Sequence, residues 1–132
     1  MKYYENNNFK INLDREYISS AMSNDFDCDN EVLDILKLYN EFNNNCVLND
    51  QRFRFKRIRI KGIITYIGLD IHNVPSFELS NEKNGYTLSL CCLKSDKEYK
   101  NKKVGDEIIV EGNYLITNEK YGIVLKRSEL ID

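Results

Sequence analysis

Several structural signals are scarce in this sequence of 132 residues, which has no tryptophan, one proline, one histidine and six glycines. So little proline and glycine argues against a long flexible linker, and the length suits one domain. No stretch reaches the ~18 apolar residues of a membrane-spanning helix, and residues 1–8 lack the apolar core of a signal peptide. We therefore expect a soluble, cytoplasmic protein with no membrane partner, provided that no leader was removed from the chain.

The four cysteines, Cys28, Cys46, Cys91 and Cys92, show no C-x-x-C spacing. Adjacent residues of a strand point to opposite faces, so Cys91 and Cys92 would not easily share a metal ion. With only His72 to add a nitrogen ligand, we expect no metal and no cofactor, and reduced thiols are the simplest interpretation.

Motifs of the common enzyme classes are also missing. The sequence has no G-x-S-x-G, no phosphate loop ending in G-K-S or G-K-T, and no H-E-x-x-H. Carboxylates are abundant, but none forms a pair at a recognisable catalytic spacing. We therefore expect no catalytic residues, and a binding protein rather than an enzyme.

Charge is uneven along the chain, although the formal net charge is only -2. Residues 1–51 carry a balance of -6, and residues 52–132 carry a balance of +4. The acidic half disfavours contact with nucleic acid, whereas the basic half permits it. The alternative is that the two halves simply attract each other within the fold.

Residues 1–50 are predicted to form an N-terminal helical extension with a partly disordered start, ahead of a domain at 51–132. The first dozen residues are polar and rich in asparagine. A short helix is expected at 14–22, with Asp14 as its N-cap, and a longer one at 30–43, with a polar, acidic break between them. The apolar side chains at helical spacing are Tyr17, Ile18 and Met22 in the first helix and Val32, Leu33, Ile35, Leu36, Tyr39 and Phe42 in the second.

The segment at 52–62 alternates apolar and cationic residues with a period of two, the pattern of a strand with one buried face. The predicted strand covers 54–67 and is interrupted at Gly62. A β-bulge after this glycine would return Ile67 to the face of Ile64. Ile58 and Ile60 then lie on the inward face, and Arg57, Arg59 and Lys61 lie on the outward face.

Four further strands are predicted at 76–80, 86–93, 107–115 and 121–126, with a lysine-rich loop or short helix at 94–103. Five strands and a long connection between the third and fourth are typical of the OB-fold, a small Greek-key barrel. Its first strand serves both halves of the barrel, so a glycine or bulge in its middle has a physical cause. The predicted fold class is mainly β with N-terminal helices, built on a five-stranded Greek-key OB-fold barrel.

These segments resemble the tRNA_anti-like family of bacterial OB-fold domains over residues 36–130. The family's helix ending Y-x-x-N is approximated by 39–43, and its passage L-x-G-D-x-V-x-V-x-G by 104–112. Its closing V-x-L-x-x-C-x-L corresponds to 123–130, with Ser128 at the cysteine position. The resemblance implies an OB-fold that binds nucleic acid, by analogy with anticodon-binding domains. The family's first strand, I-x-V-x-G-x-V-x-x-I, stands here as Ile58-x-Ile60-x-Gly62-x-Ile64-x-x-Ile67.

An OB-fold usually binds ligands on the outer face of its second and third strands, between the loops that follow strands one and four. Single-stranded nucleic acid needs aromatic rings for stacking and cations for its phosphates. Alternatives remain: Phe77 alternates with Leu79 as a core residue would, and the first-strand cations could pair with Glu78 or Glu111. The candidate nucleic-acid-binding residues are Arg57, Arg59, Lys61, Tyr66, Phe77 and Tyr86, with a second basic cluster at Lys94, Lys97, Lys100, Lys102 and Lys103, and Tyr114 and Tyr121 beside the last loop.

The leading interpretation is a small OB-fold protein that binds single-stranded DNA or RNA. The alternative is a protein–protein interaction module, such as a small inhibitor or adaptor encoded by a phage or another mobile element. A third interpretation is a structural barrel that dimerises by strand pairing. None of these patterns specifies the oligomeric state.

Overall fold

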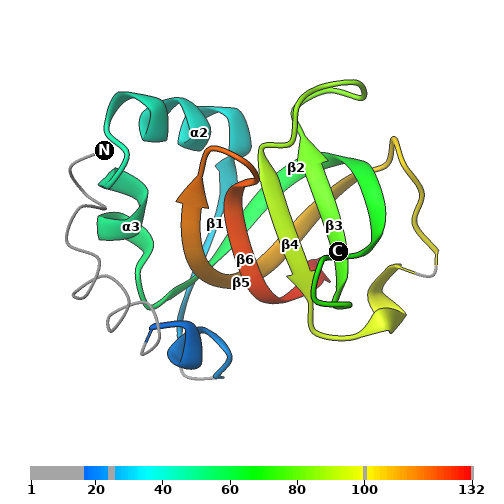
Figure 1. The fold of residues 1–132 in the computed structure, drawn as a ribbon, viewed down its shortest axis with the longest axis horizontal. Coiled ribbons are helices and arrows are strands. Elements are labelled where there is room, and N and C mark those ends of the chain that lie inside the picture. Colours follow the sequence, from blue (N-terminus) through cyan, green and yellow to red (C-terminus); the bar gives the residue numbers. More distant parts are fainter. Residues whose placement is uncertain (1–16, 24–25, 100, 132) are drawn as a thin grey trace.

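The computed structural model describes residues 17–23, 26–99 and 101–131 (Figure 1). Residues 17–21 are helical, and a short 3-10 helix covers Asp96–Tyr99. The other elements, in chain order, are β1 Asp27–Asp34, α2 Ile35–Asn44, α3 Leu48–Phe53, β2 Lys56–Leu69, β3 Pro75–Ser80, β4 Ser89–Leu93, β5 Glu107–Asn118 and β6 Gly122–Ile131.

Five of these strands close into a barrel. Strand β2 pairs with β5 along its first half and with β3 along its second half, and the order β3-β4-β6-β5 completes the ring. Strands β4 and β6 run parallel, whereas the other neighbours in the ring are antiparallel. This order is that of an OB-like Greek-key barrel, so the predicted fold class is confirmed.

The first barrel strand has the predicted interruption and bulge. Gly62 lies against β3, and a Cβ atom at this position would come within 3.0 Å of the Leu79 side chain. The pairing of β2 with β3 shifts register between Ile64 and Tyr66, where the strand carries one extra residue. Because of this bulge, Ile67 packs against the same core as Ile64, as the sequence pattern predicted.

The segment before the barrel contains a strand that the sequence pattern did not predict. Residues 27–34 form β1, which pairs in parallel with β2 from Asp27 opposite Lys56 to Asp34 opposite Lys61. The predicted break at 23–30 and helix start at residue 30 are therefore wrong. Helix α2 begins at Ile35, and the side chain of its N-cap Asp34 accepts hydrogen bonds from the amides of Leu36 and Lys37. Hydrogen bonding to β2 outweighs the helical periodicity of this segment.

The first helix also differs from the prediction. Tyr17 and Ala21 are buried, whereas Ile18 and Met22 are about half exposed, so the predicted apolar face is wrong. The Tyr17 hydroxyl donates a hydrogen bond to the carbonyl of Tyr114 and accepts one from the amide of Phe55, just before β2. The predicted N-cap, Asp14, and the asparagine-rich start lie outside the described residues.

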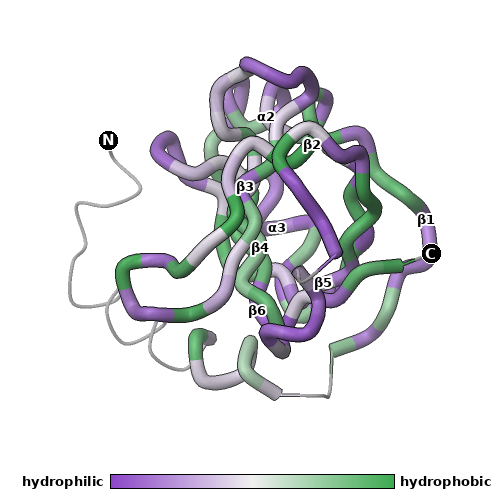
Figure 2. Tube along the Cα trace, turned by 90° about the vertical axis from the view of Figure 1, so that its right-hand side faces the viewer, coloured by the Kyte–Doolittle hydropathy of each residue, from purple (hydrophilic) through white to green (hydrophobic). Residues whose placement is uncertain are grey.

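One hydrophobic core joins the barrel to the residues before it. Ile35 and Leu38 of α2 and Phe53 of α3 belong to the same buried cluster as the inward side chains of the strands. Figure 1 shows both helices beside one end of the barrel, and Figure 2 shows hydrophobic residues concentrated in the strands. The boundary predicted at residue 51 therefore does not separate two cores.

The remaining elements follow the predicted order with different lengths. Strand β4 starts at Ser89 rather than at residue 86, while β5 and β6 extend beyond their predicted ends to Asn118 and Ile131. The lysine-rich connection contains the short helix Asp96–Tyr99. Within the described part of the chain, no helix is long and apolar enough to span a membrane.

Candidate nucleic-acid interface

Arg57 lies at the centre of a hydrogen-bond network across three strands. Its side chain is 15 % exposed, and the structure gives it five hydrogen bonds, as many as a guanidinium has N–H groups. Arg57 is therefore saturated by the protein and has no N–H group left for a phosphate. The acceptors are Glu111 Oε2 at 2.7 Å, Asn113 Oδ1 at 3.2 Å, the Arg127 carbonyl at 2.9 Å, the Glu111 carbonyl at 3.3 Å and Glu129 Oε1 at 2.9 Å.

The other two predicted cations are paired as well. Arg59 donates to Glu111 Oε1 at 3.0 Å, and the Lys61 ammonium lies 3.5 Å from Glu107. Burial alone would raise the pKa of Glu111, but hydrogen bonds from Cys28 and the two arginines outweigh it and hold that pKa below its ordinary value. Glu111 therefore remains ionised at neutral pH. It neutralises much of the charge of the cationic stripe, which consists of Arg57, Arg59 and Lys61 on the outward face of β2.

The sequence offered Glu78 or Glu111 as partners for the cationic stripe, and in the structure the partner is Glu111. Glu111 of β5 is the cross-strand partner of both arginines, whereas Glu78 accepts a hydrogen bond from the Thr87 hydroxyl at 2.7 Å. Arg57 and Arg59 thus join β2 to β5 in the barrel wall.

The three predicted aromatic platforms lie in different environments. Phe77 is wrong as a stacking surface, because its ring points into the barrel and is fully buried, as its alternation with Leu79 already suggested. Tyr86 is 91 % exposed in the connection between β3 and β4. Tyr66 is 42 % exposed on β2, and its hydroxyl donates to the carbonyl of Leu69 at 3.1 Å.

Tyr66 lines a hollow of about 210 Å³ over the outer faces of β3 and β4. This hollow lies between the loop after β2 and the loop before β6, which contributes Tyr121. It shares no lining residue with the hollows around the cationic stripe. Its lining consists of Tyr66, Leu69, Asp70, Ile71, Ser76, Glu78, Leu90 and Tyr121.

Asp70 fixes the loop on one side of this hollow. One of its carboxylate oxygens accepts the amides of His72 at 2.7 Å and Val74 at 3.0 Å, and the other faces the Cys92 thiol at 3.6 Å. Burial would raise the pKa of Asp70, but these hydrogen bonds and the Lys126 ammonium lower it overall. The loop is therefore held by an ionised carboxylate rather than by apolar packing alone.

Two lysines lie next to this hollow. The Lys120 ammonium is 5.1 Å from the centre of the Tyr121 ring, and Lys126 donates to the Cys92 thiol at 3.5 Å. The sequence pattern indicated Tyr121 beside the last loop but neither lysine. Lys126 reaches Cys92 only because β6 runs parallel to β4, a pairing that no local pattern indicates.

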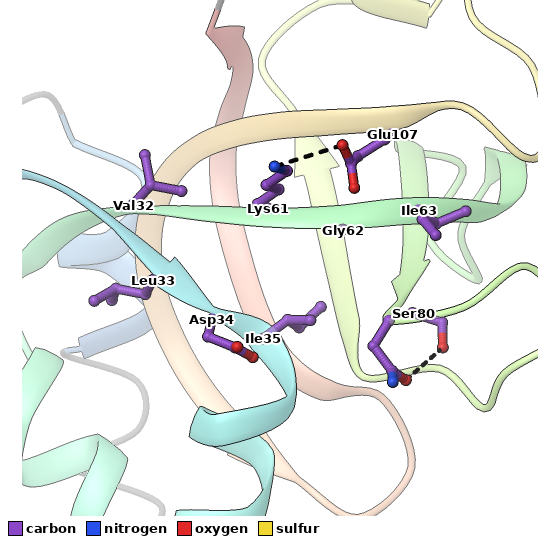
Figure 3. A pocket seen from close by; sticks show the side chains of 10 residues that line it. Val32, Leu33, Asp34, Ile35, Lys61, Gly62, Ile63, Ser80 and Glu107 are labelled. Atoms are coloured by element: carbon purple, nitrogen blue, oxygen red, sulfur yellow. Dashed lines mark hydrogen bonds and ion pairs between the residues drawn. The ribbon is translucent and has the colours of Figure 1, made fainter.

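Two larger hollows, of about 290 and 270 Å³, both include Lys61 and Glu107 in their lining. Figure 3 shows the first, where the end of β1 and the start of α2 meet the middle of β2. The Lys61 ammonium points to the Glu107 carboxylate there, and Lys102 of the second basic cluster lines the other hollow. These hollows contain cations but no exposed aromatic ring among their lining residues.

Three comparisons with known proteins concern the family and the fold of this chain. No curated protein matches the chain. Among solved structures, the chain is similar to one described as a "putative nucleic acid-binding lipoprotein" from Klebsiella pneumoniae, with 12% identity and a TM-score of 0.61. The similarity covers 77% of this chain and 92% of that one, which at such low identity supports the fold alone. The sequence model of the tRNA_anti-like family matches residues 5–130, and the chain therefore belongs to the tRNA_anti-like family.

Proposed function

We propose that this protein binds single-stranded nucleic acid in the hollow over β3 and β4. The observation that carries the proposal is that two tyrosines, Tyr66 and Tyr121, line the same hollow between the two loops that usually bind ligands in OB-folds. Family membership and the nucleic-acid-binding description of the solved neighbour support the same class of ligand.

The proposed contacts are stacking of unpaired bases on the two tyrosine rings. Every base has a π-face, so such contacts bind single strands with little sequence preference. Lys120 and Lys126 supply the positive charge next to the hollow, while Asp70 is already engaged by its own loop. Affinity therefore comes mainly from stacking, with a moderate electrostatic contribution.

The test is a fluorescence-anisotropy titration of labelled single-stranded DNA and RNA oligomers at low and moderate salt. Replacing Tyr66 or Tyr121 with alanine should weaken binding roughly 5- to 100-fold, because each ring stacks one base. Tyr86→Ala is the matched control, since Tyr86 is exposed but does not line the hollow. We expect this control to bind as tightly as the wild type.

Salt supplies the second readout. Two phosphate-neutralising lysines predict a shallow slope of affinity against salt, with an exponent of about 1.4 for single strands. Absence of binding at low salt, or equal losses in the Tyr66, Tyr121 and Tyr86 variants, would sink the proposal. The variant Arg57→Glu is unsuitable here because it breaks the network of the barrel wall.

A second candidate function is docking of a protein partner on the same face. Leu69 is 49 % exposed and Ile71 is 79 % exposed at the rim of the hollow, and exposed apolar side chains of this kind favour protein contacts. Binding of a purified partner that is lost in Ile71→Ser, in a protein that binds no oligonucleotide, would favour this alternative.

A further inference from the structure

A separate, smaller hollow of about 90 Å³ lies where Lys94, just after β4, approaches β6 and the start of β2. It has less than half the volume of the hollow over β3 and β4, so it suits a small anion such as a tetrahedral oxyanion better than a nucleobase. Each lining residue has a polar side chain. These residues are Ser23, Arg57, Lys94, Asn113, Arg127 and Glu129.

The charge around this hollow is positive. Three of the lining side chains are cations, and only Glu129 is an anion. The network behind the hollow adds one more cation, Arg59, and one more carboxylate, Glu111, so the excess of two positive charges remains. A small polar hollow with this balance attracts an anion.

Arg127 is the cation with unused hydrogen-bonding capacity. Its guanidinium makes no hydrogen bond or ion pair with any residue that the structure describes, whereas its carbonyl accepts one from Arg57. Arg127 has a φ of 50°, in the left-handed region that favours glycine. It lies where β6 shifts register against both β4 and β5, and such bulges often redirect a side chain.

The floor of the hollow is fixed by groups that are already satisfied. Asn113 donates to the carbonyls of Ala21 and Ser23 and accepts from Arg57, whose own N–H groups are all used. An anion would therefore bind to the remaining donors, the Lys94 ammonium and the Arg127 guanidinium. Lys94 is half exposed, and its ion pair with Glu129 is long, at 3.9 Å. The Lys94 side chain can therefore turn toward a ligand.

We propose that this hollow binds a phosphate group through Lys94 and Arg127. A guanidinium binds two phosphate oxygens side by side, and the ammonium adds a point charge. The phosphate would be a terminal monoester or an internal diester of a nucleic acid. The diester source rests on the proposed function, whereas binding of free phosphate does not.

The site is about four residues along β4 from Leu90, which lines the tyrosine hollow. That separation is roughly 13 Å along a strand. Leu90 and Cys92 belong to a buried cluster on the outer side of β4, and Lys94 follows them at alternate positions. One strand of nucleic acid can therefore reach both sites.

The test is isothermal titration of the full chain with inorganic phosphate, comparing the wild type with Arg127→Gly. Glycine is suited to this backbone conformation, so the variant should unfold at no lower temperature than the wild type while binding phosphate at least about tenfold more weakly. Lys37→Ala is the matched control, because Lys37 is an exposed lysine on α2, outside the hollow. We expect its phosphate affinity to be unchanged.

Either absence of saturable phosphate binding in the wild type or equal affinity in the wild type and Arg127→Gly would overturn the proposal. Oligonucleotides with and without a 5′-phosphate then identify the source. A loss in Arg127→Gly confined to the phosphorylated oligomer indicates a terminal monoester, and an equal loss for both indicates a backbone diester. Phosphate binding without any oligonucleotide binding would support this site while contradicting the function proposed for the tyrosine hollow.

Discussion

Replacing Arg57 with methionine should destabilise the barrel strongly, because Arg57 is a structural tie rather than a free cation. Methionine keeps most of the aliphatic stem and removes only the charged head and its five hydrogen bonds. The change leaves Glu111, which is 10 % exposed, with less compensation for its burial.

The size of the loss follows from burial and from what remains. Removing one partner of a buried ion pair typically costs about 3–5 kcal/mol. Arg57 and Glu111 retain some exposure, and Arg59 still donates to Glu111, so we expect a loss of about 2–4 kcal/mol. Arg59→Met should cost about 0.5–1 kcal/mol, and Lys61→Met, whose pair is more than half exposed, about 0–0.5 kcal/mol.

Urea denaturation measures the free energy of unfolding of these three variants, whose changed residues all lie on the outward face of β2. With an m-value of about 1–3 kcal/mol/M, Arg57→Met should lower the midpoint by roughly 1–2 M, and the m-value should not change. The double variant Arg57→Met/Glu111→Met should lose less than the sum of the single changes, because it leaves no unpaired carboxylate. Equal midpoint shifts for Arg57→Met and Lys61→Met would refute this account of the network.

Three further predictions test the fold and its electrostatics. Gly122→Ala should cost about 2–4 kcal/mol in urea denaturation, because φ is 71° and the new Cβ would lie 2.1 Å from the Leu88 carbonyl oxygen, whereas Gly105→Ala, with open space around it, should cost only about 1–2 kcal/mol. Because the pKa of Glu111 is lowered in the fold, its ionised form stabilises the protein at pH values above the ordinary pKa of 4.5, and this contribution should disappear as the pH falls below 4.5. The free energy of unfolding should therefore fall less steeply with acid in Glu111→Gln than in the wild type, and parallel curves for the two proteins would contradict the assignment. Asp70→Ala should lower the free energy of local opening of its loop by about 1–2 kcal/mol, seen as faster hydrogen exchange at the two amides that it holds, and unchanged exchange would show that packing fixes the loop.

The barrel could be predicted largely because its signals are local. Period-two alternation placed Ile58, Ile60 and Ile64 on the inner face of one strand, and all three are fully buried. The phase error at Ile67 predicted a bulge that the pairing with β3 contains. These patterns depend on which side chains face the core, and that requirement is written into consecutive residues.

The wrong predictions concern residues whose pairing with distant strands outweighs the structural preference of the local sequence. Residues 30–34 begin a run of apolar spacing that suits a helix, yet they form the end of β1 because the edge of β2 offers them hydrogen-bond partners. The cationic stripe is a second example. The sequence showed that Arg57 faces outward but not that carboxylates and carbonyls of β5 and β6 would occupy all of its N–H groups.

The sequence by itself therefore determined the barrel, the orientation of its first strand and the family to which the chain is similar. Only the tertiary structure decided which of the outward side chains remain available to a ligand. Tyr66 and Tyr121 meet in one hollow, and Lys94 and Arg127 in another, because strands distant in the chain are neighbours in the closed sheet. Burial follows a local period, whereas partnership across a sheet depends on strand order and register, which no single segment encodes.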